Sequence, residues 1–134
     1  MFKNVVSRFR FRGLGVILER GSSLSHCEVG RFVRICSNSV LYQVQIGDMS
    51  YVGAHSAITR TAIGRFTSIG PHVLIGLGSH PVGSFVSTHP AFYSPHRRAA
   101  KSFCSASSFT EHESIRIGGD VWIGARSTIL DGVT

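Results

Sequence analysis

Histidine is the residue type in this chain that is best suited to proton transfer near neutral pH, and the histidines gather in one stretch. Residues 80–116 hold four of the seven histidines, namely His80, His89, His96 and His112. The same residues include five aromatic side chains, Phe85, Phe92, Tyr93, Phe103 and Phe109. A segment of this composition can wall a site against a neighbouring subunit, so we expect a functional loop here.

The elements that must position this loop are set by a repeat of aliphatic residues. Spacings of six, six and five residues recur through twelve units, at Val29, Ile35, Leu41, Ile46, Val52, Ile58, Ile63, Ile69, Ile75, Ile117, Ile123 and Ile129. Three steps span 17 residues, so every third aliphatic residue falls in the same column. Leu18 and Leu24 stand 17 residues before Ile35 and Leu41, which extends the register one coil earlier. Helical stripes need spacings of three and four, so the pattern argues against amphipathic helices.

Small residues hold fixed places in each unit. Glycine follows the aliphatic residue in eight of the twelve units, although only 15 of 134 residues are glycine. The residue four positions after the aliphatic is small or β-branched in every unit except the one that has Gln45. We expect the first position to avoid crowding at a corner and the second to point into a narrow interior. The prediction is an all-β, three-sided parallel β-helix with one long inserted loop.

A single domain of residues 1–134 is expected, because nothing in the composition divides the chain. Residues 1–17 would lead into the prism, 18–79 would form its coils, 80–116 would be the inserted loop, and 117–134 would resume the coils. The sequence stops in mid-pattern at Thr134. We therefore expect either a chain that is cut short at this end or a β-helix that ends in an open edge.

The composition restricts the class of protein. The charge is +7, yet Lys and Arg are spread along the chain without a nucleic-acid-binding signature, so we expect no nucleic acid partner. No apolar run is long enough for a signal peptide or a membrane span, so a cytoplasmic location is expected. Arg8, Arg10 and Arg12 alternate with two phenylalanines, which predicts a short strand with a basic and an aromatic face. The three cysteines, Cys27, Cys36 and Cys104, fit neither a disulfide framework nor a zinc ribbon and are expected to be reduced thiols.

The repeats resemble those of the hexapeptide-repeat acyltransferase superfamily, whose left-handed β-helices form trimers. Two segments are similar to its xenobiotic and sugar acetyltransferase branch: Ile75-Gly76-Leu77-Gly78-Ser79-His80-Pro81 at the start of the loop, and Gly118-Gly119-Asp120-Val121-Trp122-Ile123-Gly124 after it. The resemblance implies acetyl-coenzyme A as co-substrate, a homotrimer and no metal cofactor. It also implies that His80 is the general base, which takes the proton of an acceptor hydroxyl during direct transfer of the acetyl group.

Other loop residues are alternatives to this assignment. His89, in a second His-Pro step, is the second choice for the base, or else it shapes the loop or contacts the acceptor. His96, with Arg97 and Arg98, forms a solvated turn or contacts an anionic acceptor. Cys104 would carry an acyl-enzyme, but direct transfer in the resembling family argues against this route.

Outward positions on the coils supply the remaining candidates. Trp122 is expected to point outward, and we assign it to coenzyme binding together with Gly124, Ala125 and Arg126. The alternatives for the Trp122 indole are a subunit contact or plain surface packing. His55 and His72 lie on the outside of the coils, where they pack at a subunit interface or bind a metal. Their spacing does not match that of the carbonic anhydrases that share this fold, so no metal is expected.

The expected function is acetyl-coenzyme A-dependent O-acetylation of a hydroxyl on a sugar or polysaccharide precursor. Acetylation of an antibiotic-like compound is one alternative. The other is a non-catalytic β-helix that serves assembly and has lost its coenzyme site. No acceptor is identified by the residues themselves.

Overall fold

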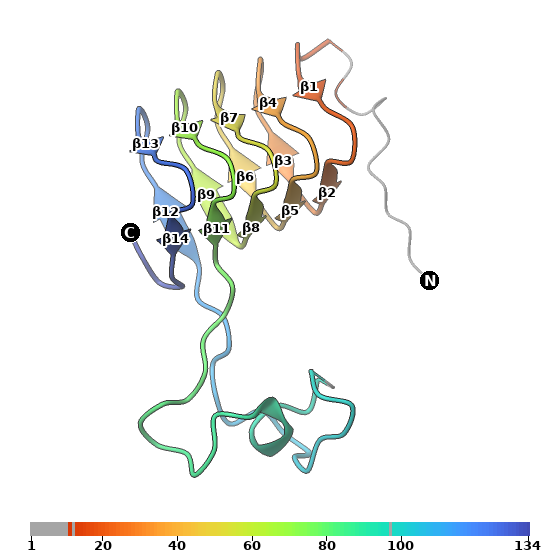
Figure 1. Cartoon of the computed structure of the whole chain (residues 1–134), viewed down its shortest axis with the longest axis vertical. Helices are drawn as coiled ribbons and strands as arrows, with labels where there is room; N and C mark the ends of the chain where they lie inside the picture. The colour runs from red at the N-terminus through yellow and green to blue at the C-terminus, as the bar shows by residue number, and fades with distance from the viewer. Residues whose placement is uncertain (1–10, 12, 97) are drawn as a thin grey trace.

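The structure is a computed structural model that describes residues 11, 13–96 and 98–134. The strand predicted from Arg8, Arg10 and Arg12 lies outside the described residues. The described part is a parallel β-solenoid with three sheets, compatible with the expected left-handed β-helix (Figure 1). The all-β prediction is confirmed.

Each face of the solenoid is one parallel sheet built from very short strands. The first sheet contains β1 (Ile17–Leu18), β4 (Arg34–Ile35), β7 (Tyr51–Val52), β10 (Ser68–Ile69) and β13 (Trp122–Ile123). The second contains β2 (Ser23–Ser25), β5 (Val40–Tyr42), β8 (Ala57–Thr59), β11 (Leu74–Ile75) and β14 (Thr128–Ile129). The third contains β3 (Glu28–Val29), β6 (Gln45–Ile46), β9 (Thr61–Ile63) and β12 (Ile115–Ile117).

The strand register follows the predicted columns. Ile35 pairs with Val52, and Val52 pairs with Ile69, so one turn of the solenoid contains about 17 residues. The earlier coil suggested by Leu18 and Leu24 is present, because Leu18 pairs with Ile35 and Leu24 with Leu41. After the insertion, Ile117 returns to the column of Ile63.

The interior is lined by these aliphatic columns and by a second set of inward residues at the corners. The second set follows the aliphatic residue by four positions in the six-residue units, where Val33, Ser39 and Ser50 are buried. In the five-residue units the prediction was wrong by one position. Val44 and Thr61 are buried there, whereas Gln45 is exposed. The five-residue unit has one residue fewer before the corner, so the inward position is the third residue after the aliphatic residue instead of the fourth.

Buried serines at these corners are bonded to the next coil. Ser39 Oγ donates to the Gly53 carbonyl at 2.9 Å, and Ser50 Oγ donates to the Gly64 carbonyl at 2.9 Å. The same serine oxygens accept the backbone N–H groups of Ser56 and Thr67 from the next coil. A hydroxyl is therefore tolerated in this narrow core because its hydrogen-bonding capacity is met internally.

The corners place ordinary residues in the left-handed region of backbone space. Met49, His55 and Phe66 have φ angles of 61°, 58° and 60°. Their N–H groups donate to carbonyls of the preceding coil, for example Phe66 N–H to the Asp48 carbonyl at 2.9 Å. These bonds offset the strain that the conformation imposes on a residue with a Cβ.

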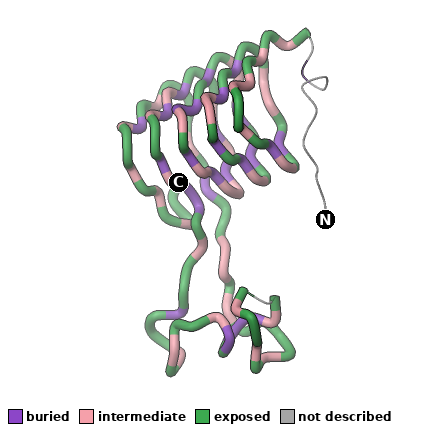
Figure 2. Tube along the Cα trace, turned by 45° about the vertical axis from the view of Figure 1, so that its right-hand side comes forward, coloured by how far each residue is buried: buried purple, intermediate pink, exposed green. Residues whose placement is uncertain are grey.

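The predicted insertion leaves the prism at the corner between the second and third sheets. It departs after β11 and returns at β12, which begins at Ile115. The insertion projects from the prism and carries one short 3-10 turn, η2 (Pro90–Phe92) (Figure 1). A few of its residues are buried although it stands away from the coils, which gives it a small core of its own (Figure 2).

Close stacking of the coils predicts that an alanine substitution destabilises the protein at one glycine and not at another. A Cβ at Gly53 would lie 2.4 Å from the carbonyl carbon of Gly70, whereas one at Gly83, in the insertion, would meet no atom within 4 Å. We expect Gly53→Ala to lower the free energy of unfolding by about 1–3 kcal/mol, because the neighbouring coil must shift. Gly83→Ala is the matched control and should leave stability nearly unchanged. Urea denaturation at one protein concentration measures both, and equal midpoints for the two variants would contradict this packing.

Candidate functional site

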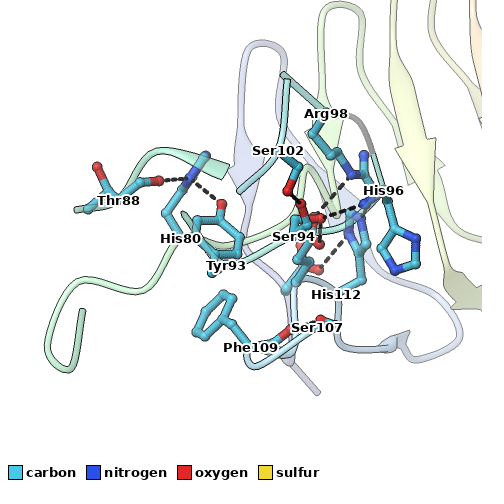
Figure 3. A network of polar contacts seen from close by, with 12 residues as sticks. His80, Thr88, Tyr93, Ser94, His96, Arg98, Ser102, Ser107, Phe109 and His112 are labelled. Atoms are coloured by element: carbon cyan, nitrogen blue, oxygen red, sulfur yellow. Dashed lines mark hydrogen bonds and ion pairs between the residues drawn. The ribbon is translucent and has the colours of Figure 1, made fainter. Parts of the chain in front are cut away.

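His80 is held by two oxygen atoms on the same ring nitrogen. Its Nδ1 lies 2.9 Å from the Thr88 carbonyl oxygen and 2.8 Å from the Tyr93 hydroxyl (Figure 3). The side chain is otherwise exposed. The ring is thus fixed from one side while its Nε2 edge is left without a partner among the described residues.

The Thr88 carbonyl favours one tautomer of His80. A carbonyl oxygen can only accept, so this contact favours a proton on Nδ1, and the Tyr93 hydroxyl oxygen can accept from the same N–H. Neutral imidazole has one N–H, and a proton on Nδ1 leaves the lone pair on Nε2. This is the state that a general base requires.

Tyr93 supports this arrangement from a buried position. It is 1% exposed, and its ring packs edge-on against Phe85 and Phe109 at centroid distances of 6.1 and 5.5 Å. Burial, and then the nearby charge of Glu111, raise the pKa of the phenol, so the hydroxyl stays protonated. Of the five aromatic residues of the insertion, Phe85, Tyr93 and Phe109 form this cluster, whereas Phe92 and Phe103 stack on each other and are exposed.

The root of the insertion is joined to the prism by one carboxylate. Asp131 Oδ1 accepts the N–H of Gly78 at 2.9 Å, and Oδ2 accepts the N–H of Glu113 at 3.0 Å. Gly78 lies on the outgoing segment and Glu113 on the returning one, and Ser79 N–H donates to the Glu111 carbonyl between them. The Asp131 side chain is 5% exposed. Asp131 therefore anchors both ends of the insertion. The outgoing anchor point, Gly78, lies two residues before His80.

A polar network continues from this root into the insertion. Ser94 Oγ donates to Glu111 Oε1, and Arg98 Nε lies 3.0 Å from Glu111 Oε2 (Figure 3). Arg98 also donates to Nε2 of His112 at 2.7 Å. Ser94 is buried and directly follows Tyr93, so this network and the aromatic cluster brace the same short segment.

His112 has a defined protonation state in this network. Arginine has no acceptor, so Nε2 must accept from Arg98 and the proton of the neutral ring must sit on Nδ1. Nδ1 is buried and lies 3.6 Å from Asp131 Oδ2, too far for a hydrogen bond. Burial, and then the charges of Arg60 and Arg98, lower the pKa of His112 below its ordinary value of 6.5. The ring is therefore neutral where the insertion joins the prism.

His89, the second choice for the base, has one ring nitrogen engaged within the loop. Its Nδ1 accepts the N–H of Ala91 at 3.2 Å and so caps the turn η2. A backbone N–H can only donate, which places the proton of the neutral ring on Nε2 and leaves no free lone pair. This geometry favours the alternative in which His89 shapes the loop.

The remaining loop candidates are spread out. His96 is exposed and Cys104 is half-buried, with its Sγ 3.8 Å from the Ala91 carbonyl oxygen. All three cysteines are unpaired, and Cys27 lies in the core, where burial raises the pKa of its thiol. No polar contact joins Cys104 to a histidine in the part of the chain that the structure describes.

The residues assigned to coenzyme binding are not brought to His80 within one chain. Trp122 points outward from β13, as predicted, and is 81% exposed. Gly124, Ala125 and Arg126 follow at the next corner, where Arg126 has a φ of 63°. This corner joins the first and second sheets, whereas the insertion that carries His80 leaves the prism between the second and third (Figure 1).

His55 and His72 form a stacked pair on the outside of the coils. Their rings are 5.1 Å apart and nearly parallel, because the residues occupy the same corner in successive turns. Within residues 11, 13–96 and 98–134, no three side chains of the kinds that bind metals gather into a group. In the same residues, no helix has the length and apolar character needed to cross a bilayer.

Several residues of this site were missed from the sequence. The Thr88 carbonyl has no sequence signature, and Asp131 reaches Gly78 across 53 positions. Arg60 lies in a five-residue repeat unit and looks like an ordinary corner residue. Tyr93 did have a signal, since it is the one tyrosine among the phenylalanines of the insertion. A buried hydroxyl of that kind needs a polar partner, and His80 is that partner.

The anchoring role of Asp131 is testable by hydrogen exchange. In Asp131→Ala the amide protons of Gly78 and Glu113 lose their acceptor, and we expect them to exchange about 10-fold faster or more. Asp48→Ala is the matched control, because Asp48 accepts the N–H of Arg31 at 2.7 Å at another corner. That variant should speed exchange at Arg31 alone. Unchanged exchange at Gly78 and Glu113 in Asp131→Ala would contradict the anchor.

The lowered pKa of His112 predicts a loss of stability in acid. Above about pH 7 the ring is neutral in both the folded and the unfolded chain and contributes no pH dependence. As the pH falls below 6.5, the unfolded chain takes up the proton first, so stability falls until the lowered pKa of the folded state is reached. His112→Gln keeps an acceptor for Arg98 but cannot titrate. We expect urea midpoints of this variant to fall less with acidification, and an unchanged slope would refute the assignment.

The chain was compared with models of protein families, with curated proteins and with solved structures. No match was found in any of the three comparisons.

Proposed function

We propose that this chain is an acetyl-coenzyme A-dependent O-acetyltransferase in which His80 is the general base. The observation that carries the proposal is the pair of contacts at His80 Nδ1, from the Thr88 carbonyl and the Tyr93 hydroxyl. In the tautomer that the Thr88 carbonyl favours, Nε2 carries the lone pair that a general base needs, which supports the proposal. The resemblance of the junction Gly78-Ser79-His80-Pro81 to acetyltransferases supports the same role.

The proposed reaction is a direct transfer. Nε2 of His80 removes the proton of an acceptor hydroxyl while the oxygen attacks the thioester carbonyl of acetyl-coenzyme A. The C–O bond of the ester forms and the C–S bond breaks. The proton passes from His80 to the departing thiolate, which gives the acetyl ester and coenzyme A. The acceptor proposed is a sugar or a polysaccharide precursor.

A second copy of the chain supplies what one chain lacks in this proposal. His80 stands on a projecting insertion, and the outward-facing Trp122 lies on another part of the prism. A homotrimer would set the insertion of one subunit against the coils of the next, so that Trp122, Gly124, Ala125 and Arg126 of a neighbour could bind the coenzyme. The exposure of Trp122 favours such a contact.

Thiol release from acetyl-coenzyme A, followed with a panel of sugars and hydroxylated antibiotics, tests the proposal. We expect turnover with a sugar acceptor, and a decrease of about 10²-fold or more in His80→Ala, because proton transfer in the transition state is lost. Circular dichroism would check that the variant is folded. His89→Ala should retain most of the activity if its ring only caps η2. Near-normal rates in His80→Ala with loss in His89→Ala would reverse the two roles.

Absence of both turnover and coenzyme binding by calorimetry would contradict the enzymatic proposal. That result would favour the alternative of a non-catalytic β-helix used in assembly. Activity confined to the antibiotics would instead favour a xenobiotic acetyltransferase.

A further inference from the structure

Two adjoining clefts open where the insertion meets the prism. Their volumes are ≈ 410 and ≈ 430 Å³, and both are lined by Arg60, Arg98 and His112. Arg60 comes from the corner between the second and third sheets, whereas Arg98 and His112 come from the insertion. Two guanidinium groups therefore line the same hollow from opposite sides of the junction. None of these residues belongs to the contacts that hold His80.

The two arginines differ in how their charge is balanced. Arg98 is paired with Glu111 at 3.0 Å, and it also donates to His112. Arg60 has no carboxylate within ion-pair distance in the described chain, and its guanidinium lies over the Tyr42 ring, 5.7 Å from the centroid. A guanidinium without a carboxylate, in a cleft, is a ready partner for an oxyanion.

The carboxylates near the cleft are already engaged. The charged groups that face His112 are Arg60, Arg98, Asp131 and Glu111. Glu111 is paired with Arg98 and accepts from Ser94, while Asp131 accepts the N–H groups of Gly78 and Glu113. The Arg60 guanidinium is therefore the charge in the cleft that is left for an anion.

The cleft shares a wall with the site around His80. Phe109 lines the ≈ 410 Å³ cleft and packs against Tyr93, with the ring centroids 5.5 Å apart. On its other side, the Tyr93 hydroxyl contacts His80 Nδ1 at 2.8 Å (Figure 3). The rings of Phe109 and the buried Tyr93 therefore form the wall between the cleft and His80, and an acceptor held by the arginines must reach around this wall to present its hydroxyl to His80.

We propose that this cleft binds an oxyanion group, phosphate or carboxylate, carried by the acceptor whose hydroxyl is acetylated. The acceptor class is then an acidic sugar or a sugar phosphate. This identification of the ligand as an acceptor rests on the proposed function. The binding of an oxyanion by the guanidinium groups of Arg60 and Arg98 does not, and the neutral His112 ring lines the cleft without donating to the anion.

The chain itself supplies a suitable variant for the test. Gln43 occupies the corner equivalent to Arg60 one coil earlier, with φ angles of 55° and 49° at the two positions. Arg60→Gln therefore installs a residue that this corner already accepts, and it removes the charge without a change of backbone. Arg20→Gln is the matched control, because Arg20 is exposed on the prism and lines neither cleft.

Binding is measured without reference to catalysis. Inorganic phosphate, glucuronate and neutral glucose are titrated separately into the protein, and the imidazole signals of His112 are followed by NMR. We expect phosphate or glucuronate, but not glucose, to shift these signals in the unaltered protein and in Arg20→Gln. In Arg60→Gln the affinity should fall about 10-fold or more, as for loss of a charged hydrogen-bonding partner. The absence of a shift, or equal affinity in Arg60→Gln, would overturn the proposal.

Kinetics then separate this inference from the proposed function. With an acidic acceptor, Arg60→Gln should raise KM about 10-fold or more and change kcat little, while a neutral acceptor should be used poorly by both proteins. Equal KM values for acidic and neutral acceptors would overturn the inference and leave acetyl transfer intact. Oxyanion binding without acetyl transfer to any acceptor would keep the site but contradict its assignment to an acceptor, and with it the proposed function.

Discussion

Backbone hydrogen bonding between successive coils is the constraint on which the rest of the molecule depends. Each strand has only two or three residues, and its partners lie one full turn away in sequence. No strand of this length is stable alone, so the sheets exist only because the coils stack in register. The stacking in turn leaves no room for a side chain at positions such as Gly53. It also requires left-handed corners, whose N–H groups bond to the coil before.

Polar groups at one corner connect this regular prism to an irregular insertion. A carboxylate of the resumed coils, Asp131, fixes the two ends of the insertion, while Glu111 and Arg98 brace its interior. Because the stacked coils hold this corner in place, the two ends of the insertion have a fixed position. His80, two residues after Gly78, is then oriented by Thr88 and Tyr93. The candidate base is thus positioned by local contacts in the loop and by an anchor that is distant in sequence.

The sequence predicts the prism well because its information is periodic. A single spacing rule places Leu18, Ile35, Val52 and Ile69 in one column, and the structure pairs them accordingly. The error at Gln45 arose where the unit length changes, since a shortened unit shifts the inward position by one residue. Periodicity also located the insertion, because the pattern stops there.

The interior of the insertion is not periodic, and its contacts were beyond sequence reasoning. Position at the junction singled out His80, but the tautomer of its ring depends on a backbone carbonyl whose location follows from the path of the loop. The different orientation of His89 arises in the same way, from the N–H of Ala91. Long-range pairs such as Gly78 with Asp131 are fixed only when the prism has brought both residues to one corner.

Because Asp131 anchors both ends of the insertion, the length of the insertion can vary at little cost to the coils. Once the two ends are joined at the corner, the entropic cost of closing the loop grows only with the logarithm of its length, about 0.6 kcal/mol for each doubling. Segments of different length and sequence can therefore be accommodated between Gly78 and Glu113 while the coils below remain unchanged. A change in the length of the insertion should therefore cost the coils little stability as long as Asp131 keeps its two backbone partners.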